Sequence, residues 1–304
     1  MSIDLVVPKE VELSTLLDEL RKLSWASADV LMAYARGEEP PYGFPKSLTV
    51  EEGGDGPVSA ADMAVNELLI SGLKDNLTFK QWDILSEETS KEKTFQQENY
   101  KKDWCWILDP LDGTKDFLQG SENYAVHIAL AYKQKPKIGI VLIPEKDELW
   151  FGIVGIGAWF ENRDGSKKHF SFSERKDISK LILVSSKNHQ QSKLNNLLST
   201  LCFGETKKIG SVGCKVASIL RGEADVYISL SGKTAPKDWD MAAPHALIEA
   251  AGGMFSHADG RNIIYQEINY SQSGCLIASH GKSHQKICQK AMEFFSLEEP
   301  NYLV

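Results

Sequence analysis

The chain has 304 residues, a length typical of one large domain or two small ones. Its 34 basic and 42 acidic side chains give a formal net charge of -8, and 42% of its residues are hydrophobic. This ordinary globular composition excludes a disordered chain, a collagen-like repeat and a coiled coil as descriptions of the whole. The acidic balance also excludes generic binding to a nucleic acid polymer. An acidic surplus is either solvated surface or carboxylates gathered around metal ions, and the motifs must decide between the two.

Hydrophobic periodicity predicts helices over residues 10–36 and 59–73, separated by a proline-containing break and a turn-rich loop or hairpin tip at 51–57. Ser59 is expected to cap the second helix, with Asp62 three residues later. From residue 82 the pattern changes to β. Predicted strands cover residues 82–85, 104–108, 125–132, 137–143, 148–154 and 158–160, the last four of them antiparallel.

In the second half of the chain, strands and helices alternate. Strands are expected at 181–185, 225–229 and 275–278, and helices at 191–201, 212–221, 239–251 and 283–295. A polar, turn-rich stretch near residues 161–178 separates the two patterns. We therefore expect an N-terminal α+β subdomain over residues 1–170, with an antiparallel sheet, and a C-terminal α/β subdomain over residues 171–304.

The N-terminal segment lacks the apolar stretch of a secretory signal, and no run approaches the roughly 18 apolar residues of a membrane span. The five cysteines are scattered and include no Cys-x-x-Cys pair, which is typical of reduced thiols. These features favour a cytoplasmic protein without stable membrane insertion. The oligomeric state is open between a monomer and a homodimer.

The most informative segment is Asp109-Pro-Leu-Asp-Gly-Thr114, directly after an expected apolar strand. Pro110 fixes the exit from the strand, so Asp109 and Asp112 should lie close together on one loop. Two carboxylates at such a short distance repel each other unless a cation neutralises them, and Mg²⁺ prefers carboxylate and carbonyl oxygens. Gly113 permits close backbone approach, and Thr114 offers a hydroxyl and a backbone N–H to an anion. The alternative is a tight Asp-Gly turn after a core strand.

Further acids stand at the ends of expected elements. Glu87 and Glu88 follow a short strand, where paired glutamates are commonly solvated surface. Asp62 lies in the first turn of a helix, where an aspartate can serve only as a cap or as a partner of the helix dipole. Asp238 and Asp240 begin a helix of small residues, where an acid could equally be a cap. Together these positions favour a metal site over scattered surface acids.

The runs at 109–114 and 239–243, the latter Trp-Asp-Met-Ala-Ala, resemble the paired signatures of the Mg²⁺-dependent, lithium-sensitive inositol monophosphatase superfamily. The segments Pro-Val-Ser-Ala-Ala-Asp at 57–62 and Ser-Glu-Glu at 86–88 match its two other metal-site segments in the right order. The resemblance covers about residues 10–295. It implies an α/β (α+β layered) fold, a five-layer αβαβα sandwich of the inositol monophosphatase and fructose-1,6-bisphosphatase type.

The resemblance further implies a phosphatase that works by direct attack of a metal-activated water, with two or three Mg²⁺ ions as cofactors. The implied catalytic residues are Asp62, Glu87 and Thr114. The implied metal ligands are Glu87, Asp109, Asp112, Asp240, the carbonyl of Leu111, and Asp62, which would hold a further ion or orient the water with Thr114. Most of these ligands belong to the expected N-terminal subdomain.

Beyond the metal motifs, the chain is similar to the 3'-phosphoadenosine 5'-phosphate phosphatases, the bisphosphate nucleotidase branch of the superfamily. Lys115 follows Asp-Gly-Thr, where inositol monophosphatases more typically continue Thr-Asn-Phe. His189 would approach the nucleotide, and Ser211 and Lys215 at a helix start would meet a phosphate. The implied substrate contacts are Gly113, Thr114, Lys115, His189, Ser211, Lys215 and Asp240.

One departure leaves the substrate open. The nucleotidase branch usually has an arginine where this chain has Ser229, and Lys233 or Lys237 would be the nearby substitute. We expect a small-molecule phosphate ester as partner: either phosphoadenosine phosphate, which belongs to sulfur metabolism, with phosphoadenosine phosphosulfate as a further substrate, or an inositol or sugar (bis)phosphate. A non-catalytic binding protein on the same fold would need the loss of a metal ligand, and none of the expected acids is missing.

Other polar residues receive structural interpretations. His127 lies inside an apolar strand and is interpreted as a core histidine, and His245 as a packing or rim residue. Asp116 and Asp238 are interpreted as surface residues or as partners of the metal ligands.

Overall fold

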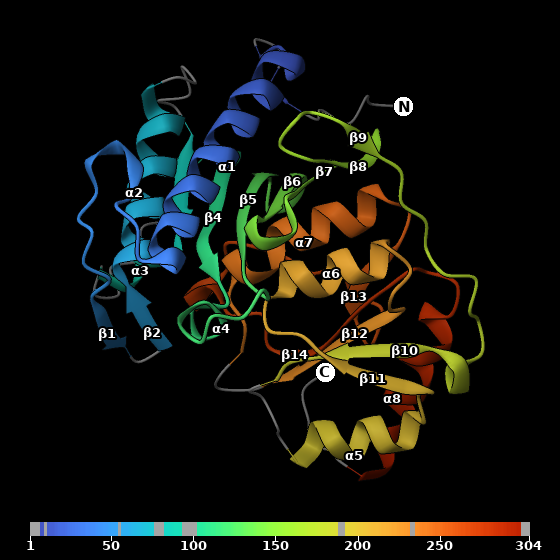
Figure 1. Ribbon diagram of the computed structural model, residues 1–304. Helices are drawn as coiled ribbons and strands as arrows, with labels where there is room; N and C mark the ends of the chain where they lie inside the picture. The colour runs from blue at the N-terminus through green and yellow to red at the C-terminus, as the bar shows by residue number, and fades with distance from the viewer. Residues whose placement is uncertain are drawn as a thin grey trace.

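Two β-sheets alternate with layers of helices in this computed structural model, which gives five layers in the order αβαβα (Figure 1). The structure describes residues 7–8, 11–53, 56–75, 82–92, 102–187, 192–231 and 235–298. Clusters of buried apolar side chains fill the spaces between neighbouring layers. The layered α/β fold that the sequence motifs imply is confirmed.

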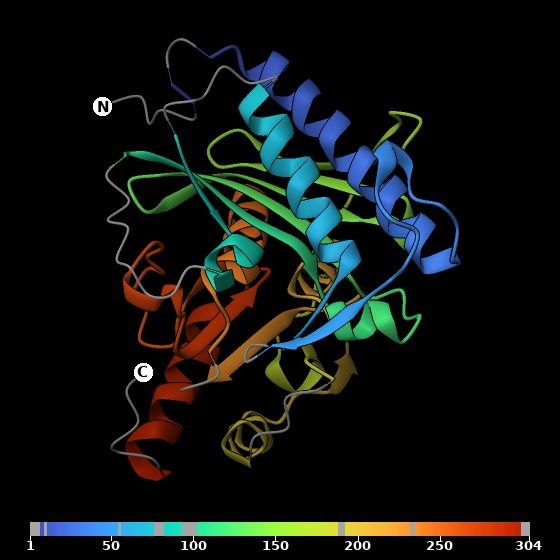
Figure 2. The same ribbon diagram turned by 90° about the vertical axis from the view of Figure 1, so that its left-hand side faces the viewer.

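The first layer consists of α1 (Leu13–Arg36) and α2 (Ala60–Asp75), which run side by side over one face of the larger sheet (Figure 2). Gly37 ends α1 in the left-handed conformation, with φ of 67°, and its N–H and that of the next residue close the last turn. Between the helices, β1 (Val50–Gly53) pairs with β2 (Gly56–Ser59), so the hairpin alternative for residues 51–57 is confirmed.

The larger sheet has seven strands in the order β3-β4-β5-β6-β7-β8-β9. The β3–β4 pair is parallel and the other pairs are antiparallel, which confirms the expected run of antiparallel strands. Its central strands are buried on both faces, which explains their continuous apolar sequences. The strands are β3 (Asp83–Ser86), β4 (Trp104–Asp112), β5 (Ala125–Tyr132), β6 (Lys135–Ile143), β7 (Glu148–Ile153), β8 (Gly157–Glu161) and β9 (Lys167–Lys168).

The middle layer contains α6 (Val212–Leu220) and α7 (Asp238–Ala250), packed between the two sheets. Glycines let α7 approach the larger sheet closely. A Cβ at Gly139 would lie 2.3 Å from the carbonyl oxygen of Ala243, and one at Gly152 would lie 2.4 Å from the Cα of Leu247. Helix α7 therefore rests directly on the backbone of β6 and β7, which places its N-terminal turn beside the end of β4.

The second sheet has five strands in the order β11-β10-β12-β14-β13, and α5 (Ser192–Leu201) and α8 (His284–Glu298) cover its outer face. Three of its strands match the expected ones, but the sequence missed two edge strands. Polar Glu-Thr-Lys-Lys forms one of them, and Met-Phe-Ser-His forms the other, so neither shows a run of apolar residues. The strands are β10 (Ile182–Ser185), β11 (Glu205–Lys208), β12 (Val226–Ser231), β13 (Met254–His257) and β14 (Gly274–Ser279).

The end of β4 differs from the sequence expectation. The strand was expected to stop at residue 108, with Asp109 and Asp112 on a following loop, but β4 continues to Asp112. Its pairing with β5 shifts register between Asp109, which faces His127, and Asp112, which faces Ala125. This bulge absorbs Pro110, which cannot donate to the ladder. The two carboxylates are therefore fixed by the sheet itself.

The boundary expected near residue 170 stays a prediction. Strand β9 ends at Lys168 and β10 begins at Ile182, so the chain passes from one sheet to the other across the polar stretch. Helix α7, however, packs against strands of both sheets.

Candidate metal centre

Three carboxylates from two distant segments meet at one point. Asp109 and Asp112 come from the bulged end of β4, and Asp240 comes from the first turn of α7. One carboxylate oxygen from each lies within 4.8 Å of the other two. This proximity depends on the close seating of α7 on the larger sheet. The structure therefore brings together the acids of both paired motifs.

A fourth acid, Glu87, faces the same point from α3 (Glu87–Glu92), which directly follows β3. Burial, followed by the negative charges of Glu87, Asp112 and Asp240, raises the pKa of Asp109 well above its ordinary value. Burial and the charges of Asp112 and Glu87 raise the pKa of Asp240 in the same way. So many converging negative charges call for a neutralising partner.

The carboxylate of Asp109 has an oxygen that is available to a cation. Its side chain is fully buried, and Oδ1 accepts a hydrogen bond of 3.0 Å from the backbone N–H of Leu111. Its Oδ2 is buried without a hydrogen-bond partner among the residues that the structure describes. A buried carboxylate oxygen without a donor is costly, and hard divalent cations prefer such oxygen ligands. The residues present therefore fit a magnesium-type ion.

Asp62 caps its helix and also contacts Thr114. Its Oδ2 accepts from the backbone N–H of Ser59 at 2.8 Å and from the Ser59 hydroxyl at 2.5 Å, which caps the start of α2. Its Oδ1 accepts a 3.0 Å hydrogen bond from the hydroxyl of Thr114, which also lies 3.1 Å from the carbonyl oxygen of Leu111. Burial raises the pKa of Asp62, although these hydrogen bonds oppose the shift.

The N-terminal turn of α6 holds Asp112 in place. Oδ2 of Asp112 accepts from the hydroxyl of Ser211 at 2.6 Å and from the backbone N–H groups of Val212 and Gly213 at 2.5 and 3.3 Å. The helix dipole at this end also favours a negative charge. All of these contacts go to Oδ2, so Oδ1 is the atom that the described surroundings leave for an ion. The predicted phosphate contact Ser211 thus lies against a predicted metal ligand.

Gly213 is the residue that permits this close approach. A Cβ there would lie 2.3 Å from Nε2 of His127 and 2.7 Å from a methyl carbon of Val141. We expect Gly213→Ala to lower the free energy of unfolding by about 1–3 kcal/mol and to reduce phosphatase turnover, because α6 must move away from Asp112. Urea unfolding and a phosphate-release assay check both effects. A variant with unchanged stability and turnover would contradict this packing.

The two lysines predicted to contact substrate differ in exposure. Lys115 is exposed on α4 (Thr114–Leu118), whose start at Gly113 has a φ of 98°. Lys215 is fully buried, and its Nζ donates to the carbonyl of Gly210 at 2.5 Å and lies 5.1 Å from the ring centre of Tyr227. Burial lowers the pKa of Lys215, while the charges of acids around the site oppose the shift.

The other residues considered for substrate binding are His189, Ser229, Lys233 and Lys237. His189 lies outside the described residues, as does Lys233. Ser229 is partly buried on β12. The Nζ of Lys237 reaches Ser271 at 3.0 Å. The roles of these side chains stay predictions.

Asp116 was interpreted as a surface residue or a partner of the ligands, and it is buried. Its Oδ1 accepts a 2.7 Å hydrogen bond from Nζ of Lys187, two residues after the end of β10. No motif in the sequence marks Lys187. A charge pair between residues 71 positions apart leaves no local pattern that could have revealed it. Asp238 is likewise buried, held by the backbone N–H of Gln266 and the amide of Gln272.

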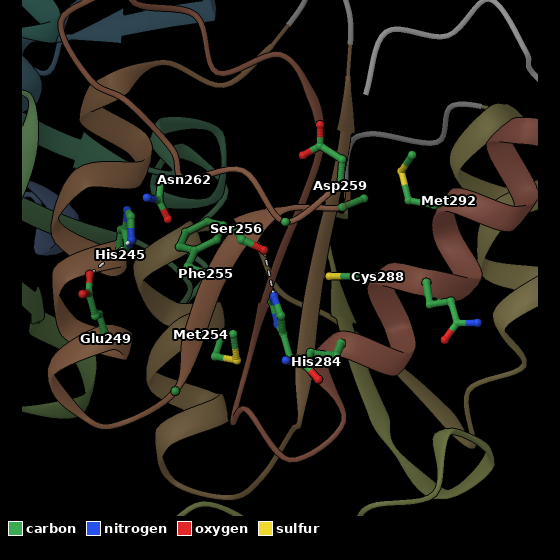
Figure 3. Close-up of a pocket in the computed structure, with 15 residues that line it drawn as sticks. His245, Glu249, Met254, Phe255, Ser256, Asp259, Asn262, His284, Cys288 and Met292 are labelled. Atoms are coloured by element: carbon green, nitrogen blue, oxygen red, sulfur yellow. Dashed lines mark hydrogen bonds and ion pairs between the residues drawn. The ribbon is translucent and has the colours of Figure 1, made fainter.

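A separate pocket of about 630 Å³ lies between α7, β13 and α8 (Figure 3). His245 and Glu249 line one side, and His284, Cys288 and Met292 line the other. None of the predicted site residues lines this pocket. His245 has the packing and rim position expected for it.

His284 in this pocket predicts an acid-sensitive stability. Its ring nitrogens lie 2.8 and 2.9 Å from the hydroxyls of Ser256 and Ser279, and burial lowers its pKa to about 4. Between an unfolded pKa of about 6.5 and this value, the folded state binds fewer protons than the unfolded state. The free energy of unfolding should therefore fall as the pH decreases through that window, by up to about 3 kcal/mol.

Urea unfolding between pH 7 and pH 4.5 measures this slope. His284→Asn removes one proton-binding group and should flatten the slope, although His245, whose pKa is also lowered to about 4, keeps part of it. Equal slopes for the wild type and His284→Asn would contradict the assignment.

In the part of the chain that the structure describes, every helix is too short or too polar to cross a bilayer.

The chain is similar to known proteins over most of its length. The model of the inositol monophosphatase family matches residues 13–294. The 3'(2'),5'-bisphosphate nucleotidase CysQ of Buchnera aphidicola is 32% identical over 227 residues, which cover 72% of this chain and 78% of the relative. The CysQ nucleotidase of Escherichia coli K12 is 30% identical over 250 residues, which cover 82% of this chain and 94% of the relative.

Solved structures share the fold. The Thermotoga maritima IMPase aligns with a TM-score of 0.72 and 21% identity, covering 92% of this chain and 98% of that chain. The inositol monophosphatase from Anabaena (Nostoc) aligns with a TM-score of 0.69 and 23% identity, covering 93% of this chain and 97% of that chain. The shared fold therefore covers more than nine tenths of this chain.

Proposed function

The chain belongs to the inositol monophosphatase family, and from this premise we propose that it is a Mg²⁺-dependent 3'(2'),5'-bisphosphate nucleotidase. The phosphatase class follows from the family and from relatives that align over most of the chain. The observation that carries the proposal is the buried cluster of Asp109, Asp112 and Asp240, in which Oδ2 of Asp109 has no hydrogen-bond partner among the described residues.

Asp109, Asp112, Asp240 and Glu87 would hold the ions, with the carbonyl of Leu111 and the carboxylate of Asp62 as further ligands. Two or three Mg²⁺ ions bound there would lower the pKa of water, neutralise phosphate oxygens and stabilise the leaving alkoxide. The chain itself fixes the carboxylates before substrate arrives, through the sheet register at β4 and the N-terminal turn of α6. Such preorganised ligands need little rearrangement during the reaction.

Asp62 and Thr114 form a pair that can take up a proton. The hydroxyl of Thr114 donates to Oδ1 of Asp62, so its oxygen can accept a hydrogen bond from a water molecule. The water would give a proton to Oγ1 of Thr114 while the Thr114 hydroxyl gives its own proton to Oδ1 of Asp62. Burial raises the pKa of Asp62, which makes its carboxylate a better proton acceptor than an ordinary aspartate.

The phosphate and the leaving group require other groups. The backbone N–H groups of Gly113 and Thr114 would hold the phosphate oxygens. Lys115 on the exposed face of α4 and His189 would contact the nucleotide. Ser211 and Lys215 at the start of α6 are buried and already bonded to Asp112 and Gly210, so they would reach a phosphate only if these side chains moved. The names of the CysQ relatives support a bisphosphate nucleotide as substrate, with the 3'-phosphate of 3'-phosphoadenosine 5'-phosphate removed. Phosphoadenosine phosphosulfate would be a related substrate. Either substrate would place the enzyme in sulfur metabolism.

A second candidate keeps the same metal centre and changes the substrate to an inositol or sugar phosphate. Ser229 favours it, because a serine supplies no positive charge for a second phosphate. The solved structures that share the fold carry the name inositol monophosphatase, but at 21% and 23% identity they support the fold alone.

Product analysis tests the nucleotidase proposal. With phosphoadenosine phosphate and Mg²⁺, we expect one inorganic phosphate per nucleotide and 5'-AMP as the product, with no release when EDTA is present. 5'-AMP offered as substrate should stay intact. Adenosine 3'-phosphate as the product, or equal turnover in EDTA, would overturn the proposed reaction.

A further inference from the structure

His127 lies between the two segments that carry the carboxylate cluster. It sits in the middle of β5 with no exposed surface. Nε2 of His127 is 3.3 Å from Oδ2 of Asp112, and Nδ1 is 3.3 Å from the carbonyl oxygen of Trp239. Trp239 directly precedes Asp240 in α7. The imidazole therefore touches one acid of the cluster and the peptide unit that leads into another.

The ring is confined from further sides. Across the strand pair, His127 is the register partner of Asp109, the third acid of the cluster. From the opposite side, Gly213 of α6 approaches so closely that a Cβ there would lie 2.3 Å from Nε2. The imidazole can thus neither swing away from Asp112 nor turn toward solvent.

The hydrogen-bond pattern argues against a core histidine that is merely satisfied. The carbonyl of Trp239 and the ionised carboxylate of Asp112 can only accept, and a neutral imidazole carries one N–H, so the ring can hydrogen-bond to only one of them at a time. Nε2 is buried without a hydrogen bond of good geometry among the described residues and faces the carboxylate of Asp112. A leucine or valine at this position of an apolar strand would avoid the cost of burying an unsatisfied ring nitrogen.

We propose that His127 is a positioning residue that links Asp112 on β4 to the start of α7 and thereby sets the separation of Asp112 and Asp240. The inference rests on the proposed metal role of these two acids. His127 is buried inside the strand, as expected of a core histidine, and the proposal gives it a further role. That role concerns the affinity for divalent ions rather than a contact with substrate.

Three substitutions separate the two contacts. His127→Asn places an amide near the position of Nδ1 and can keep the bond to Trp239. His127→Gln reaches the position of Nε2 and can keep the contact with Asp112. His127→Leu removes both. His284→Gln, which removes a buried histidine from the remote pocket, is the matched control.

Isothermal titration with Mn²⁺ alone measures the ion affinity, and unfolding in EDTA measures the stability of the metal-free protein. We expect His127→Leu to weaken Mn²⁺ binding about 10–100-fold, the Asn and Gln variants to weaken it less, and the control to bind like the wild type. At saturating Mg²⁺ the KM for substrate should be unchanged, because His127 acts through the acids.

Several outcomes decide the matter. Equal Mn²⁺ affinity for His127→Leu and the wild type, with only the stability in EDTA lowered, would overturn the inference and leave the proposed function intact. If His127→Leu does not fold, equal affinities of both amide variants and the wild type would overturn it as well. A wild-type protein that hydrolyses substrate yet binds no ion would overturn the metal centre and this inference together.

Discussion

Asp112→Asn is expected to lower kcat for phosphate release by more than about a hundredfold at saturating Mg²⁺, because it alters a direct ligand of the proposed centre. Ser211 and Val212 both donate to Oδ2 of Asp112, so the carbonyl oxygen of the asparagine must face α6. Its NH₂ group would then point toward the ion site, where it repels a cation. Steady-state kinetics with phosphoadenosine phosphate measures the loss.

The folded state should tolerate this substitution, because the donors of α6 keep an acceptor. Circular dichroism and urea unfolding of Asp112→Asn in EDTA are therefore expected to match the wild type within about 1 kcal/mol. Glu293→Gln, on the exposed face of α8, is the control for loss of one negative charge. Phosphatase activity of Asp112→Asn within a few-fold of the wild type would rule out the proposed ligand set.

Asp109→Asn should separate stability from activity in the opposite direction. In metal-free protein, Asp109 is fully buried beside Glu87, Asp112 and Asp240, and burial and these charges raise its pKa well above the ordinary value. Neutralising it relieves repulsion, so we expect the free energy of unfolding in EDTA at pH 8 to rise by about 1 kcal/mol, or about 2–4 °C in Tm. Activity should be lost, because an ion loses a charged ligand.

The same variant should respond less to metal. Mg²⁺ binds the folded wild type and should raise its Tm, and most of this increase should disappear in Asp109→Asn. Thermal scans with EDTA and with Mg²⁺ give both quantities. A lower Tm for Asp109→Asn in EDTA, combined with an undiminished response to Mg²⁺, would show that the buried acids are held by something other than a cation.

Much of the fold follows from local patterns. The strand at 125–132 has the predicted bounds, and α2, α6 and α7 lie within a few residues of expectation, because their apolar spacing reflects one buried face. The edge strands β11 and β13 could not be found in this way, because their sequences show neither an apolar run nor a regular alternation of apolar and polar residues. The bulge at Pro110 was also missed, since it depends on pairing with β5.

In the candidate site as well, residues in local motifs could be predicted and contacts between distant segments could not. Asp62, Asp109, Asp112 and Asp240 stand in recognisable runs, and the structure gathers the last three and links Asp62 to Thr114. Contacts between distant segments correspond to no motif in the sequence. His127 looked like one more residue of a buried strand, and only the register with Asp109 and the position of α7 reveal its neighbours. The acidic surplus of the chain thus includes a cluster with a specific proposed task.

The substrate preference of the Mg²⁺-loaded enzyme distinguishes a bisphosphate nucleotidase from an inositol or sugar phosphatase. Phosphate release is measured with phosphoadenosine phosphate, inositol 1-phosphate and fructose 1,6-bisphosphate, each with and without Li⁺. For a bisphosphate nucleotidase, we expect kcat/KM to be highest for phosphoadenosine phosphate and Li⁺ to lower the rate. A higher kcat/KM for inositol 1-phosphate or fructose 1,6-bisphosphate would contradict the assignment as a bisphosphate nucleotidase.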